Sequence, residues 1–286
     1  MWVLAAIGSA LFAGLVSVLA KAGIRNTPSN VATALRTVVV LAFAWGTVFV
    51  VGSEGTIGTV GVRSMVFLVL SGLATGASWL AYFHALQIGP VHRVVAVDKS
   101  SVIVTVLAGI MFFGETANLA AKAVGVLAVA AGTFVMLPSR SPDARRAEGA
   151  WLPFSIVAAV FAALTTLLAK VGIEHVESNL GTAIRTSVVL VMAWIVVAVQ
   201  GELGAVRRTP MRDIAWIGVS GIATGASWVC FFRALQIGPV SGVASIDRTS
   251  VIVAAVLAWL VFRERPTRAA MAGLALILVG TIALVW

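Results

Sequence analysis

Charged residues are scarce in this sequence: Asp, Glu, Lys and Arg make up 11% of its 286 residues, whereas 60% are hydrophobic. A soluble domain carries about 25% charged residues, so this chain cannot surround an ordinary core with a polar shell. Lipid must therefore serve as the solvent, and apolar runs near twenty residues each meet that requirement. The composition predicts an integral membrane protein.

Cysteine is also nearly absent. Cys230 is the single cysteine and lies inside a hydrophobic run, which excludes an intramolecular disulfide. No zinc or haem spacing and no nucleotide-binding P-loop occurs, so we expect neither a metal nor a cofactor. The 20 Lys and Arg against 11 Asp and Glu form no basic domain outside the apolar segments, so nucleic acid is not an expected partner.

An internal repeat covers almost the whole chain. SGLATGASWLAYFHALQIGPVHRVVAVDKSSVIV at 71–104 matches SGIATGASWVCFFRALQIGPVSGVASIDRTSVIV at 220–253, with 22 of 34 residues identical at a constant offset of 149. The same offset relates TALRT at 33–37 to TAIRT at 182–186. The chain is therefore a duplication. Its first repeat covers 1–137, a polar cytoplasmic linker covers 138–150, and the second repeat covers 151–286.

Turn signals and charges divide each repeat into five apolar spans. We predict an all-α membrane protein of ten transmembrane helices, with spans near 2–20, 31–51, 64–87, 91–113 and 119–137 and, in the second repeat, 151–169, 180–199, 214–236, 240–262 and 269–286. The Gly-Pro pairs at 89–90 and 238–239 end one helix and begin the next, since proline suits a first helical turn. Because five is odd, the second repeat must enter from the opposite side, so we expect inverted repeats.

Loop charges predict the orientation. The loop after the second span holds Glu54 and Arg63, whereas its counterpart holds Arg207, Arg208 and Arg212. In four such comparisons the more basic loop lies on the face of the 138–150 linker. That face is cytoplasmic by the positive-inside rule. We therefore expect a multi-pass protein of a prokaryotic inner membrane, with its N- and C-termini outside.

These strings resemble the EamA-type domains of the drug/metabolite transporter superfamily, which have five helices per domain and two domains per transporter. The resemblance rests on the lysine that closes the first span, on TALRT, SGLATGASW and FHALQIGP, and on VDKSSVIV followed by GE. It implies a transporter rather than an enzyme, within a superfamily that handles sugars, nucleotide sugars, amino acids, cations and lipids. Small multidrug relatives carry a glutamate in the first helix, which residues 4–20 and 152–169 lack. This departure argues against cationic drug efflux.

Charged residues within the spans are expensive and mark functional candidates. Arg36 and Asp98 lie about 9 and about 12 Å into their helices from the same face, so we expect them to meet, and Arg185 to meet Asp247 at the other face. Each pair is either a gate of a central cavity or a bridge that only locks helices. The predicted gate or charge network comprises Lys21, Arg36, Asp98, Lys99, Lys170, Arg185, Asp247 and Arg248. The two lysines at helix ends have the alternative of snorkelling to the interface.

Aromatic and hydroxyl residues near the middle of the spans predict a substrate cavity. Trp79 and Tyr82 share a helix face because they are three residues apart, and Ser101 lies three residues beyond Asp98. With their counterparts, the predicted lining is Trp79, Tyr82, Ser101, Trp228, Phe231 and Ser250. Ordinary interhelical packing is the alternative role for each.

Together these features predict a secondary transporter that moves a small polar metabolite by alternating access between inverted repeats. Lys21, Arg36, Asp98 and Lys99 sum to +2, as do their counterparts, which favours an anionic or zwitterionic solute. Membrane lipid is an expected partner, and coupling to a proton or a counter-solute stays open. The alternatives are a lipid-linked-sugar flippase of the same superfamily and a non-transporting membrane scaffold, which would not need two related sets of buried charges.

Overall fold

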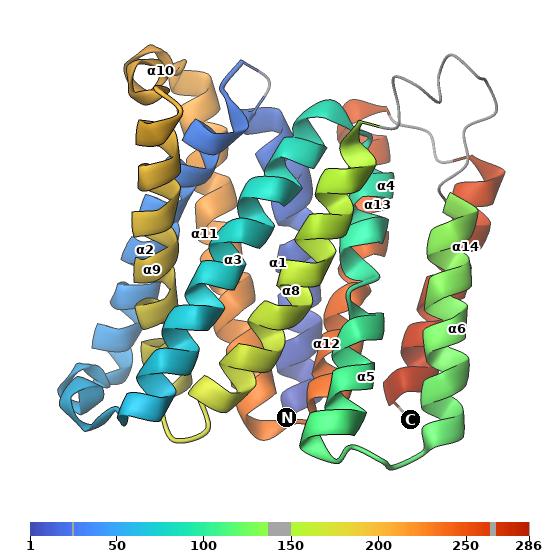
Figure 1. The fold of residues 1–286 in the computed structure, drawn as a ribbon. Coiled ribbons are helices and arrows are strands. Elements are labelled where there is room, and N and C mark those ends of the chain that lie inside the picture. The colour runs from blue at the N-terminus through green and yellow to red at the C-terminus, as the bar shows by residue number, and fades with distance from the viewer. Residues whose placement is uncertain (25, 137–149, 264–266, 286) are drawn as a thin grey trace.

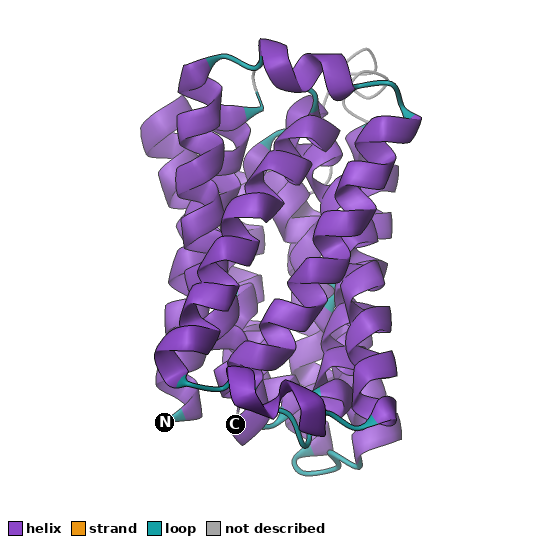
Figure 2. Cartoon of the chain, turned by 90° about the vertical axis from the view of Figure 1, so that its left-hand side faces the viewer, coloured by secondary structure: helices purple, strands orange, loops and turns teal. Residues whose placement is uncertain are grey.

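The computed structural model describes residues 1–24, 26–136, 150–263 and 267–285. Within these ranges all regular structure is helical (Figure 2). The first repeat contains α1 (Trp2–Gly23), α2 (Ser29–Val51), α3 (Val62–Ile88), α4 (Val91–Lys99), α5 (Val102–Phe113) and α6 (Leu119–Met136). The second contains α8 (Trp151–Gly172), α9 (Ser178–Val199), α11 (Met211–Ile237), α12 (Val240–Arg248), α13 (Ser250–Phe262) and α14 (Arg268–Val285). Short helices η1 (Glu54–Thr59) and α10 (Leu203–Arg208) lie in the loops after α2 and α9.

Eight segments of the described chain are long and apolar enough to cross a membrane. They are α1, α2, α3, α4 with α5, α8, α9, α11, and α12 with α13. The last helix of each repeat is shorter: α6 and α14 have 18 residues each, against the roughly 20 that a span needs. Ten spans therefore stay a prediction. The expected linker, apart from Ala150, lies outside the described residues.

Corresponding helices of the two repeats run in opposite directions through the bundle. α1 begins at the end where α14 finishes, whereas α8 begins at the other end (Figure 1). This arrangement fits inverted repeats. The repeats also interleave, because α1 packs mainly against α11, α8 against α3, α2 against α9 and α6 against α14. The centre of the bundle is therefore built by both repeats.

The fourth span of each repeat is interrupted, although its apolar pattern predicts one continuous helix. Ser101 N–H donates to Asp98 O and Ile103 N–H to Ser100 O, three residues back rather than four, and Thr249 N–H likewise bonds Ile246 O. The Ser100 and Thr249 hydroxyls donate to the carbonyls three residues back, at 2.6 and 2.7 Å, which competes with the α-helical pattern. Such a 3₁₀ turn in mid-helix often marks a functional hinge.

Lys21 and Lys170 act as caps of the third helix of each repeat. The Gly-Pro break ends α3 and α11 and leaves carbonyls without helical partners. Lys21 Nζ donates to Gly89 O at 2.7 Å, and Lys170 Nζ donates to Leu235 O at 2.8 Å and Gly238 O at 3.2 Å. In this conformation helix carbonyls bind both lysines, and their place in a central gate or charge network stays a prediction.

Candidate functional site

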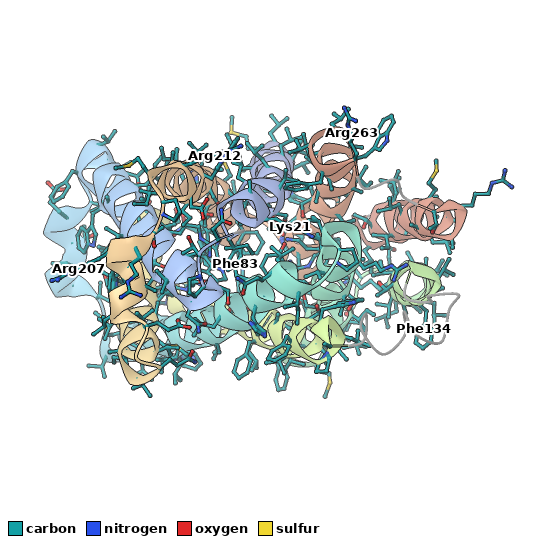
Figure 3. The ribbon with its side chains drawn as sticks, turned by 90° about the horizontal axis from the view of Figure 1, so that it is seen from above. Lys21, Phe83, Phe134, Arg207, Arg212 and Arg263 are labelled. Atoms are coloured by element: carbon teal, nitrogen blue, oxygen red, sulfur yellow. The ribbon has the colours of Figure 1, made fainter. Side chains whose placement is uncertain are left out.

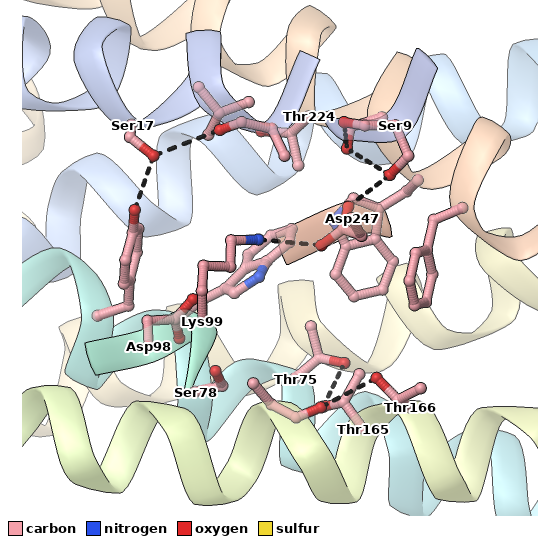
Figure 4. A pocket seen from close by; sticks show the side chains of 18 of the residues that line it. Ser9, Ser17, Thr75, Ser78, Asp98, Lys99, Thr165, Thr166, Thr224 and Asp247 are labelled. Atoms are coloured by element: carbon pink, nitrogen blue, oxygen red, sulfur yellow. Dashed lines mark hydrogen bonds and ion pairs between the residues drawn. The ribbon is translucent and has the colours of Figure 1, made fainter. Parts of the chain in front are cut away.

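A cavity of about 140 Å³ lies between the repeats, in the middle of the bundle (Figure 4). Helices of both repeats line it: α1, α2, α3 and α4 from the first, and α8, α11 and α12 from the second. Small, hydroxyl and aromatic side chains make up most of the wall. The charged side chains in it are Arg36, Asp98, Lys99, Asp247 and Arg248.

Four of the six predicted cavity residues lie in the wall: Trp79, Tyr82, Trp228 and Phe231. The rings of Trp79 and Trp228 meet edge to face with centroids 5.5 Å apart, so the two repeats touch through this pair. Tyr82 Oη lies 2.8 Å from Ser17 Oγ, within hydrogen-bond distance.

The two predicted serines lie elsewhere, and this part of the lining is wrong. Ser101 and Ser250 are buried, and their hydroxyls have no partner among the described residues. Ser101 directly precedes α5, which packs against α8 and α12. Gly14 brings the α1 backbone so close to Ser250 that a Cβ there would lie 2.9 Å from its carbonyl oxygen.

The two aspartates occupy unequal surroundings. Asp247 accepts hydrogen bonds from Ser9 Oγ at 2.7 Å, Lys99 Nζ at 3.0 Å and Arg248 Nη1 at 3.2 Å. Lys99 belongs to the other repeat, so its ion pair with Asp247 spans the cavity wall (Figure 4). Asp98 also lines the cavity but makes no hydrogen bond or ion pair with any described residue. The two aspartates are equivalent in sequence, but only Asp247 forms ion pairs with the described residues.

The expected pairs of Arg36 with Asp98 and Arg185 with Asp247 do not form. Asp247, near the end of α12, is instead paired with Lys99, at the end of α4 of the other repeat. Both arginines instead stack on aromatic rings of their own repeat: Arg36 Cζ lies 3.4 Å from the Phe83 ring centroid and 4.8 Å from that of Trp79. Cation–π contact of this kind stabilises a guanidinium at a distance from carboxylates.

Arg185 also bonds to the other repeat. Its Nε donates to Ser71 Oγ and its Nη2 to Thr75 Oγ1, both at 2.8 Å. The Ser71 hydroxyl in turn donates to Thr165 O of α8 at 2.8 Å. Three helices are thereby joined at this end of the cavity. Gly72 permits their approach, because a Cβ there would lie 2.8 Å from Arg185 O.

Arg36 has the same neighbours but none of these bonds. Ser220 and Thr224 correspond to Ser71 and Thr75. Gly221 also brings α11 close to α2, with a Cβ position 3.1 Å from Arg36 O, against 2.8 Å between the Gly72 Cβ position and Arg185 O. Yet Arg36 Nε and Nη2 and Ser220 Oγ are buried without a partner in the described chain. A second, small cavity lies between Arg36, Phe83 and Ser220. Among the described residues, the arginine is thus hydrogen-bonded to the third helix of the other repeat at the Arg185 end of the cavity but not at the Arg36 end.

The serines of the third helices repeat this difference. Ser78 donates to Ala158 O at 2.9 Å and its counterpart Ser227 to Ser9 O at 3.0 Å, so the helices are joined near the middle in both repeats. Farther along, the hydroxyl of Ser71 is bonded whereas that of Ser220 is not. The asymmetry is confined to one end.

Sequence reasoning missed these hydroxyl groups. Ser71, Thr75 and Ser78 recur at 220, 224 and 227, at spacings of four and three residues that place them on one helix face. A hydroxyl stripe on the third span, repeated in both halves, was the available signal. Phe83 was also missed, although its counterpart Phe232 lies under Arg185 at 4.2 Å.

Comparison with known proteins agrees with this architecture. The model of the "EamA-like transporter family" matches residues 1–137 and again 149–286. An "Uncharacterized transporter in cobO 3'region" from Sinorhizobium sp. is 42% identical over 135 residues, which are 47% of this chain and 95% of that protein. A solved structure described as "Crystal structure of protein" matches with a TM-score of 0.67 at 18% identity, covering 98% of this chain and 96% of its own. With a match in each repeat and a membrane bundle around a central cavity, the chain belongs to the EamA-like transporter family.

Proposed function

We propose that the protein is a secondary transporter that moves a small polar solute, anionic or zwitterionic, by alternating access. The central cavity supports the class of solute. Its wall holds three cations, Arg36, Lys99 and Arg248, against the carboxylates Asp98 and Asp247, so the site carries a net charge of +1 when all five are ionised. A solute with a negative group neutralises it.

Alternating access is carried by one observation: equivalent ends of the cavity are in opposite states. Ser71 and Thr75 bind Arg185, while the equivalent Ser220 and Thr224 do not bind Arg36. Both ends have an arginine and the same two hydroxyls. A change of conformation that breaks the bonds of Arg185 can therefore form equivalent bonds between Arg36 and the hydroxyls of Ser220 and Thr224. The two conformations then differ little in free energy, which alternating access requires.

The charge distribution supports termini outside the inner membrane. Arg207, Arg212 and Arg263 gather at the end of the bundle seen in Figure 3, and the positive-inside rule makes this end cytoplasmic. Arg36 enters from the same end, so the unbonded end of the cavity faces the cytoplasm. The described conformation is then the inward-facing one.

A pair of C-terminal fusions tests this orientation. We expect an alkaline phosphatase fusion to be active, because that enzyme folds outside the cytoplasm, and a green fluorescent protein fusion to be dark. A fusion point after Val206, on the opposite face, is the matched control and should give the reverse result. Fluorescence from the C-terminal fusion would overturn the assignment.

Substrate identity is best approached with the purified protein. A ligand that binds the folded state raises the apparent melting temperature, and more so the higher its concentration is relative to its Kd. A metabolite panel of anions, zwitterions, cations and neutral solutes therefore sorts the classes. Solutes that stabilise the protein are then tested for uptake into proteoliposomes. Stabilisation by cations alone would contradict the proposed class. Binding without any uptake would favour a scaffold or receptor.

Alanine at Trp79 or Trp228 tests the cavity as the transport site. Each ring contacts the other and lies beside an arginine, at 4.8 Å for Arg36 and 4.6 Å for Arg185. We expect uptake of a solute from the panel to fall about tenfold or more, since loss of such contacts is worth at least about 1.4 kcal/mol. Phenylalanine, which keeps a ring, is the matched control. Equal losses of uptake and thermal stability would indicate a packing role instead.

A further inference from the structure

We propose that the Nε–Nη2 edge of Arg36 binds a carboxylate group of the solute. This inference rests on the proposed transport function and assigns one residue and one chemical group within its cavity. Arg36 lines the cavity, is 3% exposed, and has no hydrogen-bond partner for Nε or Nη2 among the described residues. Two parallel N–H groups on one edge of a guanidinium match the two oxygens of a carboxylate.

The other repeat demonstrates what this edge can hold. In Arg185 the same two atoms, Nε and Nη2, each donate to a hydroxyl oxygen at 2.8 Å. The edge therefore binds two oxygen acceptors side by side at the bonded end of the cavity. At the Arg36 end the equivalent hydroxyls are present but unbonded to it. Nε and Nη2 of Arg36 are buried without an acceptor among the described residues, so an acceptor that enters through the cavity reaches this edge when the packing at this end opens.

Aromatic side chains hold the Arg36 guanidinium in place. Its Cζ lies 3.4 Å from the Phe83 ring centroid, closer than the 4.2 Å between Arg185 and the equivalent Phe232. The Trp79 ring lies beside it in the cavity wall and contacts the Trp228 ring. A solute that places its carboxylate on Arg36 thus has an aromatic surface next to its apolar part.

Arg248 is the competing anchor, because it lines the same cavity and its Nε and Nη2 are also buried without partners in the described chain. Its Nη1, however, already binds Asp247 at 3.2 Å. Arg36 binds no carboxylate of the described protein. The single excess positive charge of the cavity is therefore assigned to Arg36, and it matches one carboxylate rather than a doubly charged phosphate.

The test uses purified full-length protein with benzoate as probe and benzamide as its neutral counterpart. We expect benzoate to raise the melting temperature of the wild type with increasing concentration, and benzamide at the same concentrations not to do so. Arg36→Lys keeps the charge but loses the paired donors, so its Kd for benzoate should rise about tenfold or more. Arg248→Lys tests the competing anchor and should raise the Kd for benzoate less than Arg36→Lys does.

Two outcomes overturn the assignment: benzoate affinity unchanged in Arg36→Lys, or lost in Arg248→Lys and kept in Arg36→Lys. If Arg36→Lys does not fold, Arg36→Gln and titration of the tryptophan fluorescence of the variants replace it, with the same expectations. Stronger stabilisation by phenyl phosphate than by benzoate would reject the carboxylate as the group. Arg36-dependent benzoate binding without uptake of any solute would refute transport but leave this site standing. Uptake that survives loss of Arg36 would refute this site but leave transport standing.

Discussion

Replacing Asp247 by asparagine is expected to lower the stability of the folded protein by about 3–5 kcal/mol, the usual cost of removing one partner from a buried ion pair. The carboxylate accepts from Ser9, Lys99 and Arg248 and is 5% exposed. An amide of the same size keeps the shape but leaves two buried cations without their anion. Lys99 belongs to the other repeat, so the loss also weakens the contact between repeats.

The equivalent substitution of Asp98 is the matched control. This carboxylate makes no hydrogen bond or ion pair with the described residues and acts on Lys99 and Arg248 only across space. We expect a loss of no more than about 1–2 kcal/mol, the interaction of charges several ångströms apart at an effective dielectric constant of about 20. Unfolding of both variants in an SDS titration measures the difference. Equal losses of stability would show that the two aspartates contribute equally to the stability of the protein in solution.

Removing the hydroxyls that bind Arg185 is expected to produce the second large effect. In the double variant Ser71→Ala, Thr75→Val the guanidinium stays buried but loses both acceptors of its Nε–Nη2 edge. Hydrogen bonds to charged groups contribute about 1.5–3 kcal/mol each, so the loss should reach about 3 kcal/mol or more. The Ser71 bond to Thr165 O disappears as well.

Ser220→Ala, Thr224→Val makes the same chemical change at the other end of the cavity. Ser220 Oγ has no partner within the described ranges, and Thr224 Oγ1 bonds only the Ser220 carbonyl of its own helix. Replacing an unsatisfied buried hydroxyl by an apolar group is nearly neutral, so we expect a change within about 1 kcal/mol. The SDS titration compares the two double variants directly. A large loss at 220 and 224 would mean that the Arg36 end is bonded in most molecules.

How far the sequence predicts the site depends on the kind of residue. Trp79 and Trp228 were predicted from their position near the middle of a span, and the structure places both in the cavity wall. The cavity serines were predicted from helical spacing alone, which says which residues share a face but not which helix will cover that face. Ser101 and Ser250 are covered by neighbouring helices.

The ion-pair partners of the buried charges could not be predicted from the sequence, for a different reason. Depth along each helix suggested that Arg36 and Asp98 meet, but depth is one coordinate of three. Lateral packing decides the partner, and here the first helix of each repeat packs against the third helix of the other. Apolar residues do not reveal this arrangement in a membrane protein, because lipid-facing and core-facing positions are both apolar.

By itself the sequence determined the membrane environment, the duplication and the family. The membrane environment follows from the composition, and the duplication and the family follow from repeated sequence motifs, none of which depends on how the helices pack. Tertiary structure alone decided that Lys99 binds Asp247. It also decided that Arg185 is hydrogen-bonded to Ser71 and Thr75, while Nε and Nη2 of Arg36 have no hydrogen-bond partner among the described residues. The reason is physical: the two repeats carry the same residues at these positions, so their sequence is symmetric. If both ends of the cavity were closed in the same way, no solute could enter it. The packing of the helices therefore differs between the two ends, although the residues there are equivalent.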